Sequence, residues 1–459
     1  MVLTQANSQA LAPALRRRRE NLAQRFPGPA VVWSGRPMPR NFPANTYPFR
    51  ANSHFLYFTG RSLTQAAVHL DQGRLTLFMD DPSPASALWH GPTPDREAVA
   101  ADLGAVAAYP LADLDRYLTG AATLPTQEDF FQPRRTKPSV ADPTADQLSS
   151  ALAEAMVAIR LNHDEAALGQ IKAAASVSVE AHRAGMAATA TATTEAEVRA
   201  AMEQVIIRHN LGCAYGSIVT VHGEVLHNEQ YHHPLQPGDL LLADVGAEAA
   251  SGWASDITRT WPVSGVFSAP QRAIYAVVLA AHDACIAAAK PGVEYRDLHL
   301  LACRTLAAGL VDLGLLRGDP DGLVERDVHA LFFPHGLGHL LGLDVHDMED
   351  LGDMAGYAPG RTRSDRFGLQ YLRLDRPLAA NMMVTIEPGF YQVPGILGPA
   401  RQGGQYDDAV NWARLDSFED VRGIRIEDDV QITATGCTVL TAALPTQADA
   451  VAALVKGRL

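Results

Sequence analysis

The sequence predicts an α+β protein built from two domains, and three observations support this prediction. The chain has 459 residues, more than one hydrophobic core ordinarily spans. Short apolar runs separated by Gly, Pro and Asp fill residues 28–118, which is typical of strands joined by turns. Ala-rich stretches with helical spacing follow residue 145, and strand-like runs return from residue 331. We therefore expect a smaller domain over residues 1–150 and a larger one over residues 151–459.

The smaller domain is predicted to be mixed α/β, because its apolar runs (PAVVWSG, GRLTLFMDD, VAAYPL) are short and punctuated by turn residues. Residues 122–145 read TLPTQEDFFQPRRTKPSVADPTAD in large part and are rich in Pro, Thr and Asp. This composition indicates a linker.

The larger domain is predicted to place helices outside a curved sheet. Residues 145–208 carry two stretches with helical spacing, and residues 271–290 and 295–314 carry two more. The segment between these two pairs of helices contains two apolar runs that resemble strands joined by a turn, GDLLLADVGAE and SGWASDITRTWPV.

Charge and composition exclude several classes of function. The net charge of −13 argues against nucleic acid as the main partner, because phosphate binding requires a basic surface. No apolar run approaches the ~20 residues of a membrane helix. The basic cluster Arg16–Arg19 precedes ENLAQRF instead of an apolar stretch, so we interpret it as a solvated helix face and not as an export signal. The four cysteines form no CxxC pair, which favours reduced thiols in a cytoplasmic protein.

Residues 334–347 read PHGLGHLLGLDVHD and place His335, His339 and His346 within twelve positions. A zinc-binding helix is one reading of the HxxxH spacing. Gly336, Gly338 and Gly342 argue against a helix, because each glycine costs a helix ~1 kcal/mol relative to alanine. We therefore predict a glycine-rich loop entering a strand, from which one or two of the histidines reach a common metal.

Four acidic residues interrupt apolar strand-like runs, where an ionised carboxylate must be paired or coordinated. They are Asp244, Asp256, Glu387 and Glu427. Any one alone is as readily a strand-end carboxylate, but four together with a histidine loop favour a metal site. Oxygen-rich coordination with one imidazole suits manganese better than structural zinc, and bridging carboxylates would hold two ions ~3.5 to 4 Å apart for hydrolysis.

These residues also resemble a known family. The order of Asp244, Asp256, HGLGHLLGLDVHD, IEPGFY and GIRIEDD is similar to the pita-bread metallopeptidases, which include aminopeptidase P and prolidase. YPFRANSHFLYFTG resembles their N-terminal domain and AIRLNHDEAAL the start of their catalytic domain. The resemblance implies a pita-bread catalytic domain and an exopeptidase acting on Xaa-Pro bonds.

The resemblance also implies roles for individual residues. Two divalent ions, Mn before Co or Zn, would be held by Asp244, Asp256, His339, Glu387 and Glu427, with Asp256 and Glu427 bridging. Glu387 would serve as general acid and base, and His346 and His227 would steady the substrate carbonyl and the tetrahedral intermediate. The residues implied in substrate binding or placed around the metals are His335, Arg373, Tyr391, Arg425 and Trp89.

The sequence departs from the family pattern in two places. Asp244 and Asp256 are one residue further apart than usual, which predicts a bulge or a longer turn between them. SIVTVHGEVLHN is shorter than its family counterpart, so the role of His227 is open and His222 is an alternative.

The choice among peptidases rests on FGLQYLRLDRPL, which resembles a prolidase segment whose arginine grips the free carboxylate of a dipeptide. Arg373 falls at that position, and a bidentate arginine is the natural reader of a carboxylate. An exposed surface arginine is the alternative, since Arg376 is close by. We predict an Xaa-Pro dipeptidase, with an Xaa-Pro aminopeptidase, a carboxypeptidase of the same fold and a non-peptidase binding module as alternatives.

The resemblance further implies a homodimer, in which one subunit's N-terminal domain reaches the other's active site. Trp89 in ASALWHGPTP matches a tryptophan used in this way. A packing residue within its own domain is the competing interpretation. The expected substrate is a small peptide, with no membrane or nucleic-acid partner.

Overall fold

The computed structural model describes residues 5–126 and 143–457, which belong to two compact units. The first unit comprises Met1–Ala166 with Ala250–Gly252, and the second comprises Ala167–Ala249 with Trp253–Leu459. The boundary expected at residue 150 lies inside helix α7 (Pro143–Arg160), which groups with the first unit. Among the described residues, no helix has the length and apolarity needed to cross a membrane.

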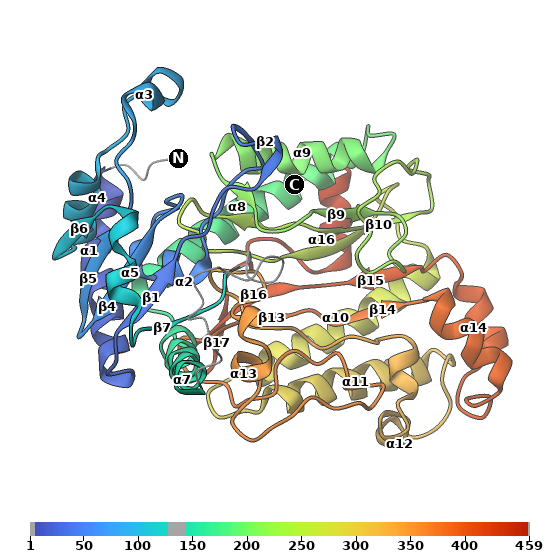
Figure 1. Cartoon of the computed structure of the whole chain (residues 1–459). Helices are drawn as coiled ribbons and strands as arrows, with labels where there is room; N and C mark the ends of the chain where they lie inside the picture. The colour runs from blue at the N-terminus through green and yellow to red at the C-terminus, as the bar shows by residue number, and fades with distance from the viewer. Residues whose placement is uncertain (1–4, 127–142, 458–459) are drawn as a thin grey trace. The chain divides into compact units, whose positions relative to one another are not determined.

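The first unit is built on a five-stranded sheet with the order β6-β5-β4-β1-β7 (Figure 1). Strand β1 runs antiparallel to β4 and parallel to β7, and the chain crosses the sheet between β6 at one edge and β7 at the other. The elements of this unit are α1 (Gln5–Arg25), β1 (Ala30–Trp33), β2 (Pro39–Phe42), β3 (Asn45–Thr46), α2 (Ser53–Thr59), β4 (Ala67–Asp71), β5 (Arg74–Phe78), α3 (Pro84–His90), α4 (Arg96–Leu103), β6 (Ala107–Tyr109), α5 (Asp115–Leu118), β7 (Ala122–Thr123) and α7.

The basic cluster on α1 is a solvated helix face only in part: Arg16 and Arg17 are exposed as predicted, but the other two arginines are not. Arg18 and Arg19 are both buried. The Arg18 guanidinium forms an ion pair with Asp164 at 2.8 Å and donates to the carbonyl of Tyr57, while Arg19 donates to the carbonyl of Leu103. Arginine stems pack against apolar surface while the planar head finds acceptors, and a one-dimensional pattern does not reveal those acceptors.

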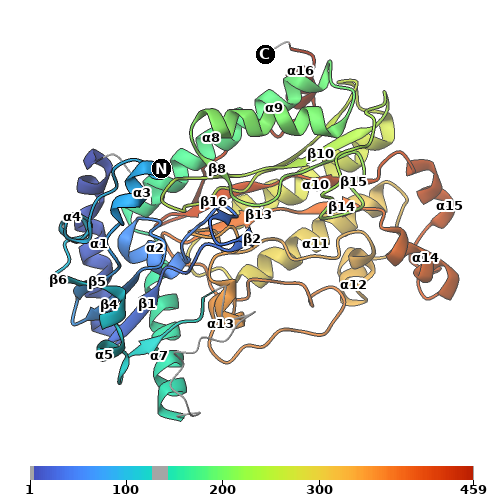
Figure 2. The ribbon, with the colours of Figure 1, turned by 45° about the horizontal axis from the view of Figure 1, so that its top comes forward.

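The second unit has strands between two pairs of helices (Figures 1 and 2). Helices α8 and α9 lie on one side of the strands, and α10 and α11 lie on the other. The elements are α8 (Glu165–Thr189), α9 (Glu195–Arg208), β8 (Gly212–Cys213), β9 (Ile218–Thr220), β10 (Leu240–Asp244), β11 (Ala247–Glu248), β12 (Thr258–Pro262), α10 (Ala269–Ala288), α11 (Tyr295–Asp312), α12 (Pro320–Glu325), α13 (Asp353–Gly356), β13 (Met383–Ile386), β14 (Gly389–Tyr391), α14 (Pro394–Gly403), α15 (Trp412–Leu415), β15 (Gly423–Arg425), β16 (Asp428–Ile432), β17 (Cys437–Val439) and α16 (Ala448–Val455).

The strands of the second unit pair in short antiparallel ladders. Strand β10 lies between β9 and β12, and β16 lies between β13 and β17. Strands β10, β12, β13 and β15 are buried along their whole length, so an acidic side chain at their ends sits in a desolvated environment. This burial is what positions the candidate site.

The helices are held to the strands by an apolar core under α8 and α9. Trp261 of β12 is fully buried, and its indole N–H donates to Thr189 at the end of α8. A Cβ at Gly185 would lie 2.6 Å from Met202, so the glycine allows α9 to pack directly on α8. On the opposite side, a capping box between Ser268 and Gln271 starts α10.

Two expectations for the predicted larger domain and the helices before it need correction. Three helices, α7, α8 and α9, occupy residues 143–208 where two were expected. Residues 335–347 do not enter a named strand; a single bridge joins Leu340 to Val384. The backbone folds back on itself there, because the Asp347 N–H donates to the Leu340 carbonyl and the Asp347 carboxylate occupies the space beside Gly342.

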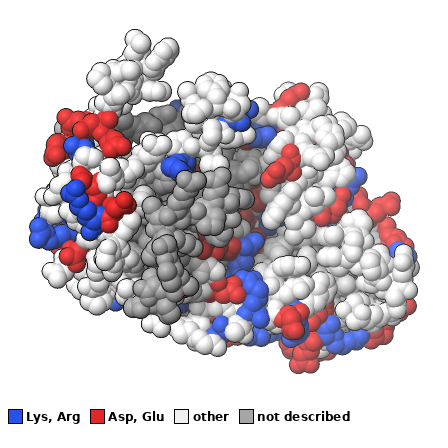
Figure 3. All heavy atoms as spheres, viewed as in Figure 1, with Lys and Arg blue, Asp and Glu red and all other residues white. Residues whose placement is uncertain are grey.

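Acidic and basic side chains are interspersed on the face shown in Figure 3. Many pairs in the described residues are exposed ion pairs, such as Arg401 with Asp416 and Arg326 with Asp408. Such pairs contribute little to stability because water screens them. The informative charges of this protein are therefore the buried ones.

Candidate active site

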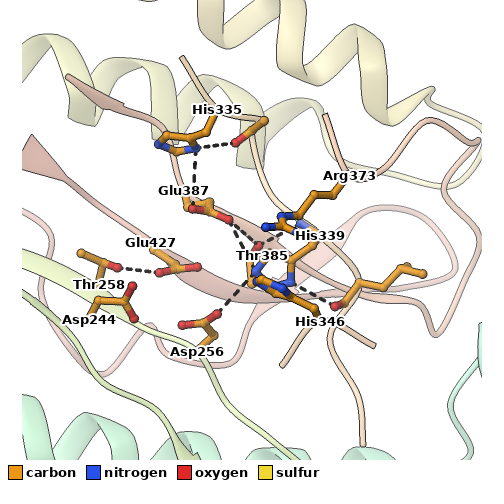
Figure 4. A network of polar contacts seen from close by, with 12 residues as sticks. Asp244, Asp256, Thr258, His335, His339, His346, Arg373, Thr385, Glu387 and Glu427 are labelled. Atoms are coloured by element: carbon orange, nitrogen blue, oxygen red, sulfur yellow. Dashed lines mark hydrogen bonds and ion pairs between the residues drawn. The ribbon is translucent and has the colours of Figure 1, made fainter. Parts of the chain in front are cut away.

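Four carboxylates and one imidazole of the second unit point into a common space (Figure 4). They come from distant parts of the chain: Asp244 ends β10, Asp256 precedes β12, Glu387 follows β13, and Glu427 lies between β15 and β16. His339 comes from the glycine-rich loop. Ligand atoms of Asp256, His339 and Glu427 all lie within 4.8 Å of one another, and all three residues are buried.

The imidazole of His339 is oriented for metal binding. Its Nδ1 lies 3.0 Å from the carbonyl of Leu340, and a carbonyl only accepts, so Nδ1 carries the proton. The Nε2 lone pair then faces Asp256 at 3.4 Å and Glu387 at 3.5 Å. A lone pair opposite two carboxylates is favourable only with a proton or a cation between them.

The pKa values of the acids show the same shortage of positive charge. Burial, followed by the charge of Asp244, raises the pKa of Asp256 well above its usual range. Burial and the charges of Asp256 and Asp244 raise the pKa of Glu427, and burial and Glu427 raise that of Glu387. Oxygen donors with one neutral imidazole fit divalent ions such as Mn²⁺, so the residues present fit the metal pair that the family implies.

A hydrogen-bonded chain fixes the wall beside the acids. The Arg425 guanidinium donates to Asp244 at 2.6 Å, to Thr258 at 2.9 Å and to the hydroxyl of Tyr391 at 3.0 Å. The Tyr391 hydroxyl lies 2.9 Å from His335 Nε2, and Thr258 donates to Glu427. Arg425 thus holds Asp244 directly. It reaches Glu427 through Thr258 and His335 through Tyr391, so it sets the spacing between these groups.

Position 338 of the glycine-rich loop, where the loop meets β13, requires glycine. A Cβ at Gly338 would lie 2.4 Å from the Thr385 carbonyl oxygen. Without it, the His339 N–H donates to the Thr385 hydroxyl, which in turn lies 3.4 Å from Glu387. This close approach carries His339 to the acids.

The acids line a cavity of about 640 Å³, within the usual size of small-ligand sites. His227, His335, His346, Arg363 and Arg373 also line it. Burial lowers the pKa of His335 to about 3 and lowers those of His227 and His346. These histidines are therefore neutral. The N–H of His335 already bonds the Gly336 carbonyl, which leaves His227 and His346 to donate an N–H to a substrate oxygen.

The structure brings together most of the residues singled out from the sequence. Tyr391 does not itself line the cavity but supports His335. His222 lies elsewhere, paired with Glu224 at 2.9 Å, so His227 is the histidine of that loop that reaches the cavity. Trp89 is 77 % exposed in the first unit and does not pack within its own domain.

Sequence reasoning missed Tyr215, whose hydroxyl lies 2.5 Å from both Asp244 and Asp256. It also missed Asp429, which accepts from the Asp256 N–H and the Ser255 hydroxyl. Tyr215 sits in CAYGSI, a stretch without any acidic or histidine signal. The segment between Asp244 and Asp256 forms a turn, with Glu248 bridged to Ala254.

Fold and site define a metal-dependent hydrolase with a pita-bread catalytic domain. Residues 169–434 match the model of metallopeptidase family M24, and residues 15–128 match the N-terminal domain of aminopeptidase P. The chain belongs to metallopeptidase family M24. The resemblance inferred from the sequence is therefore confirmed.

Relatives cover nearly the whole chain. A probable Xaa-Pro aminopeptidase of Coccidioides posadasii is 34 % identical over 408 residues, which are 86 % of this chain and 85 % of the relative. The structure of Pseudomonas aeruginosa aminopeptidase PepP is 28 % identical with a TM-score of 0.76, covering 97 % of this chain and 98 % of that one. Zn-substituted Escherichia coli aminopeptidase P in complex with product is 26 % identical with a TM-score of 0.75, covering 100 % and 99 %.

Proposed function

We propose that this metallopeptidase is an Xaa-Pro aminopeptidase, which releases the first residue of a peptide whose second residue is proline. The observation that carries the proposal is similarity over both units to proteins named for this activity, in sequence and in structure. The dipeptidase predicted first from the sequence finds no comparable support, and the aminopeptidase alternative fits better.

The surroundings of Arg373 agree with this choice. Arg373 lines the cavity, but its Nη1 donates to Glu349 at 2.6 Å. Although burial opposes ionisation of Glu349, hydrogen bonding to His346 and the charge of Arg373 lower its pKa. An ionised carboxylate beside Arg373 offsets its charge and would repel a substrate carboxylate. Arg373 is thus a weaker carboxylate anchor than a free guanidinium.

The remaining residues have separate tasks in peptide hydrolysis. Divalent ions held by Asp244, Asp256, His339, Glu387 and Glu427 would supply Lewis acidity at the scissile carbonyl. Glu387, with its raised pKa, is suited to take a proton from the attacking water and give it to the leaving nitrogen. His227 and His346, both neutral and in the cavity, are suited to donate hydrogen bonds to the carbonyl oxygen.

Product analysis by mass spectrometry tests the proposal directly. Manganese-loaded enzyme is incubated with Ala-Pro, with Ala-Pro-Ala-Ala and with a longer peptide that lacks proline. We expect release of the first alanine from the tetrapeptide. Cleavage of Ala-Pro alone would establish the dipeptidase, and shortening from the C-terminus would establish a carboxypeptidase.

The Arg373→Ala variant separates the same alternatives by kinetics. For an aminopeptidase, we expect the KM for Ala-Pro-Ala-Ala to change little. A rise in the KM for Ala-Pro equivalent to about 2 to 3 kcal/mol, the contribution of a charge-assisted hydrogen bond, would show that Arg373 anchors the carboxylate of a dipeptide.

We infer that manganese is the working ion, because the donors are mainly carboxylate oxygens. Reactivation of metal-free enzyme by Mn²⁺, Co²⁺ and Zn²⁺ in parallel tests this inference. We expect the highest kcat/KM with Mn²⁺; a higher value with either other ion would overturn it.

We also infer a homodimer in which Trp89 contacts the partner subunit. Large apolar side chains of the first unit are exposed to solvent: Met38, Phe42, Tyr47, Leu88 and Trp89. Light scattering should give twice the chain mass, and Trp89→Ala should weaken the dimer. A monomer in the wild-type protein would remove this inference.

A further inference from the structure

A second cluster of metal-binding side chains lies in the same unit, apart from the cavity. His299 and Cys303 lie four residues apart on α11, on one face of the helix. His329 lies on the short helix Val328–Leu331. One ligand atom from each lies within 4.8 Å of those of the other two. None of the three lines the cavity described above.

The cluster is buried, and three of its ring nitrogens lack hydrogen-bond partners in the described residues. His299 and Cys303 are fully buried, and His329 is 2 % exposed. Among the described residues, neither ring nitrogen of His329 has a hydrogen-bond partner, and neither does Nδ1 of His299. An unpaired buried polar atom costs about 1 to 3 kcal/mol, so three of them in one place point to a missing partner.

The protonation of the two imidazoles suits metal binding. His299 Nε2 lies 3.0 Å from the carbonyl of Gly368, and a carbonyl only accepts, so Nε2 carries the proton and Nδ1, which has no partner in the described residues, is left to bind an ion. A ring N–H bonded to a backbone carbonyl is the usual outer support of a metal-binding histidine. Burial lowers the pKa of His299 to about 4 and that of His329 to about 3. Both rings are therefore neutral, as ligands must be.

A carboxylate oxygen without a hydrogen-bond partner also lies beside the cluster. Asp327 accepts from the Arg366 guanidinium through Oδ2 at 2.9 Å, and its Oδ1 is buried without a hydrogen-bond partner in the described residues. A Cβ at Gly368 would lie 2.4 Å from Asp327 Oδ1 and 2.9 Å from His329 Nε2. The glycine thus leaves room where a carboxylate oxygen and an imidazole nitrogen converge.

We propose that His299, Cys303 and His329 bind a zinc-type ion that fastens α11 to the segment leading into the glycine-rich loop. Thiolate with imidazole selects Zn²⁺ over the oxygen-preferring Mn²⁺, so the two sites of this unit would take different metals. On binding, the Cys303 S–H bond is replaced by a sulfur–metal bond and the proton passes to solvent. The Phe333 ring lies against both His299 and His335, so the ion would stabilise the base of the active-site wall.

Cobalt is the probe that separates the two sites, because a thiolate bound to Co²⁺ gives a charge-transfer absorption in the near ultraviolet. Sulfur is absent from the donors of the active site, so that site is silent in this band. Metal-free protein with Asp256→Asn and Glu427→Gln, which disable the active-site donors, is titrated with Co²⁺. We expect the band to appear and to saturate at one ion per chain. Its absence would overturn the proposal.

Matched variants assign the band. Cys303→Ser should abolish it, whereas Cys285→Ser, a buried thiol on the neighbouring helix α10, should leave it intact. His329→Gln, which keeps the thiol, should weaken Co²⁺ binding at least about tenfold. A band that survives Cys303→Ser, or affinity unchanged in His329→Gln, would refute the site.

Metal competition gives an independent readout. Zn²⁺ should displace Co²⁺ and remove the band, and excess Mn²⁺ should not. Zn²⁺ should also raise the melting temperature of the protein with the disabled active site, but not when Cys303→Ser is added. Displacement by Mn²⁺ as readily as by Zn²⁺, or an equal Zn²⁺ effect with Cys303→Ser, would contradict a thiolate site.

Discussion

Glu427 and Asp428 are neighbours in the sequence and equally buried, yet their environments are opposite. Glu427 faces other carboxylates, and burial with the charges of Asp256 and Asp244 raises its pKa. Asp428 pairs with Arg259 at 2.7 Å and with His282 at 3.0 Å. Burial opposes the ionisation of Asp428, but the charge of Arg259 and the hydrogen bonds from His282 and Thr441 together outweigh burial, and the pKa of Asp428 is lowered.

The difference separates structural charges from functional ones. Arg259 neutralises Asp428 from within the chain and also donates to the carbonyls of Glu427 and Leu444, so that pair is complete. Arg425 and Tyr215 give the acids around Glu427 only part of the compensation they need. The remaining negative charge is what makes that cluster a site for cations.

The largest effect should follow from Glu387→Gln, which keeps the size of the side chain but removes its proton transfer. We expect kcat to fall by about 10²- to 10⁴-fold, with no loss in the free energy of unfolding, because a buried acid is replaced by a neutral group. Steady-state kinetics measures kcat, urea denaturation measures the free energy of unfolding, and metal analysis shows whether both ions are bound. Activity near the wild-type level, with both ions bound, would remove Glu387 from proton transfer.

Arg259→Ala tests the structural side of the comparison. It leaves Asp428 buried and unpaired, so we expect the free energy of unfolding to fall by about 3 to 5 kcal/mol. Urea denaturation measures this loss. A loss below about 1 kcal/mol would show that Asp428 does not need its internal cation.

Mn²⁺ should separate the two kinds of acid through pH. The raised pKa values of Asp256, Glu387 and Glu427 mean that their contribution to the stability of metal-free protein is complete below the unfolded pKa of about 4 and is lost as pH rises. Mn²⁺ binds the ionised form, so its stabilisation should grow between about pH 5 and pH 8, to about 2.7 kcal/mol at 100 times the Kd.

The contribution of Asp428 to stability should have the opposite pH dependence. Its lowered pKa means that its contribution is present above the unfolded pKa of about 3.9 and is lost as pH falls below that value, with or without Mn²⁺. Calorimetric melting temperatures, recorded across pH with and without Mn²⁺, measure both pH dependences. A Mn²⁺-induced shift in Tm that is the same at both ends of the range would contradict the assignment of the metal ligands.

The smallest effect is expected for the exposed pair of Arg401 and Asp416, at 2.9 Å with both side chains more than half exposed. Arg401→Ala should leave the midpoint of urea denaturation almost unchanged, because water screens the pair. The variant serves as the control for Arg259→Ala, since the same substitution is made in a screened pair. A loss as large as that of Arg259→Ala would mean that burial does not distinguish the two pairs.

The sequence by itself determined the family, the two-domain organisation and the acids that converge on the cavity. Carboxylates within apolar runs are costly unless compensated, so Asp244, Asp256, Glu387 and Glu427 stand out without coordinates. The helices over residues 271–290 and 295–314 followed from their periodicity. Glycines in the histidine segment correctly argued against a zinc helix.

Only the tertiary structure decided which groups meet in the interior of the protein. Tyr215, the pairing of Arg373 with Glu349, and the burial of Arg18 and Arg19 depend on contacts between segments far apart in the chain. The same is true of His299, Cys303 and His329, which carry no recognisable spacing as a set. Periodicity and motif spacing record which face of one element is buried, whereas the charge or lone pair that meets a side chain there comes from another element.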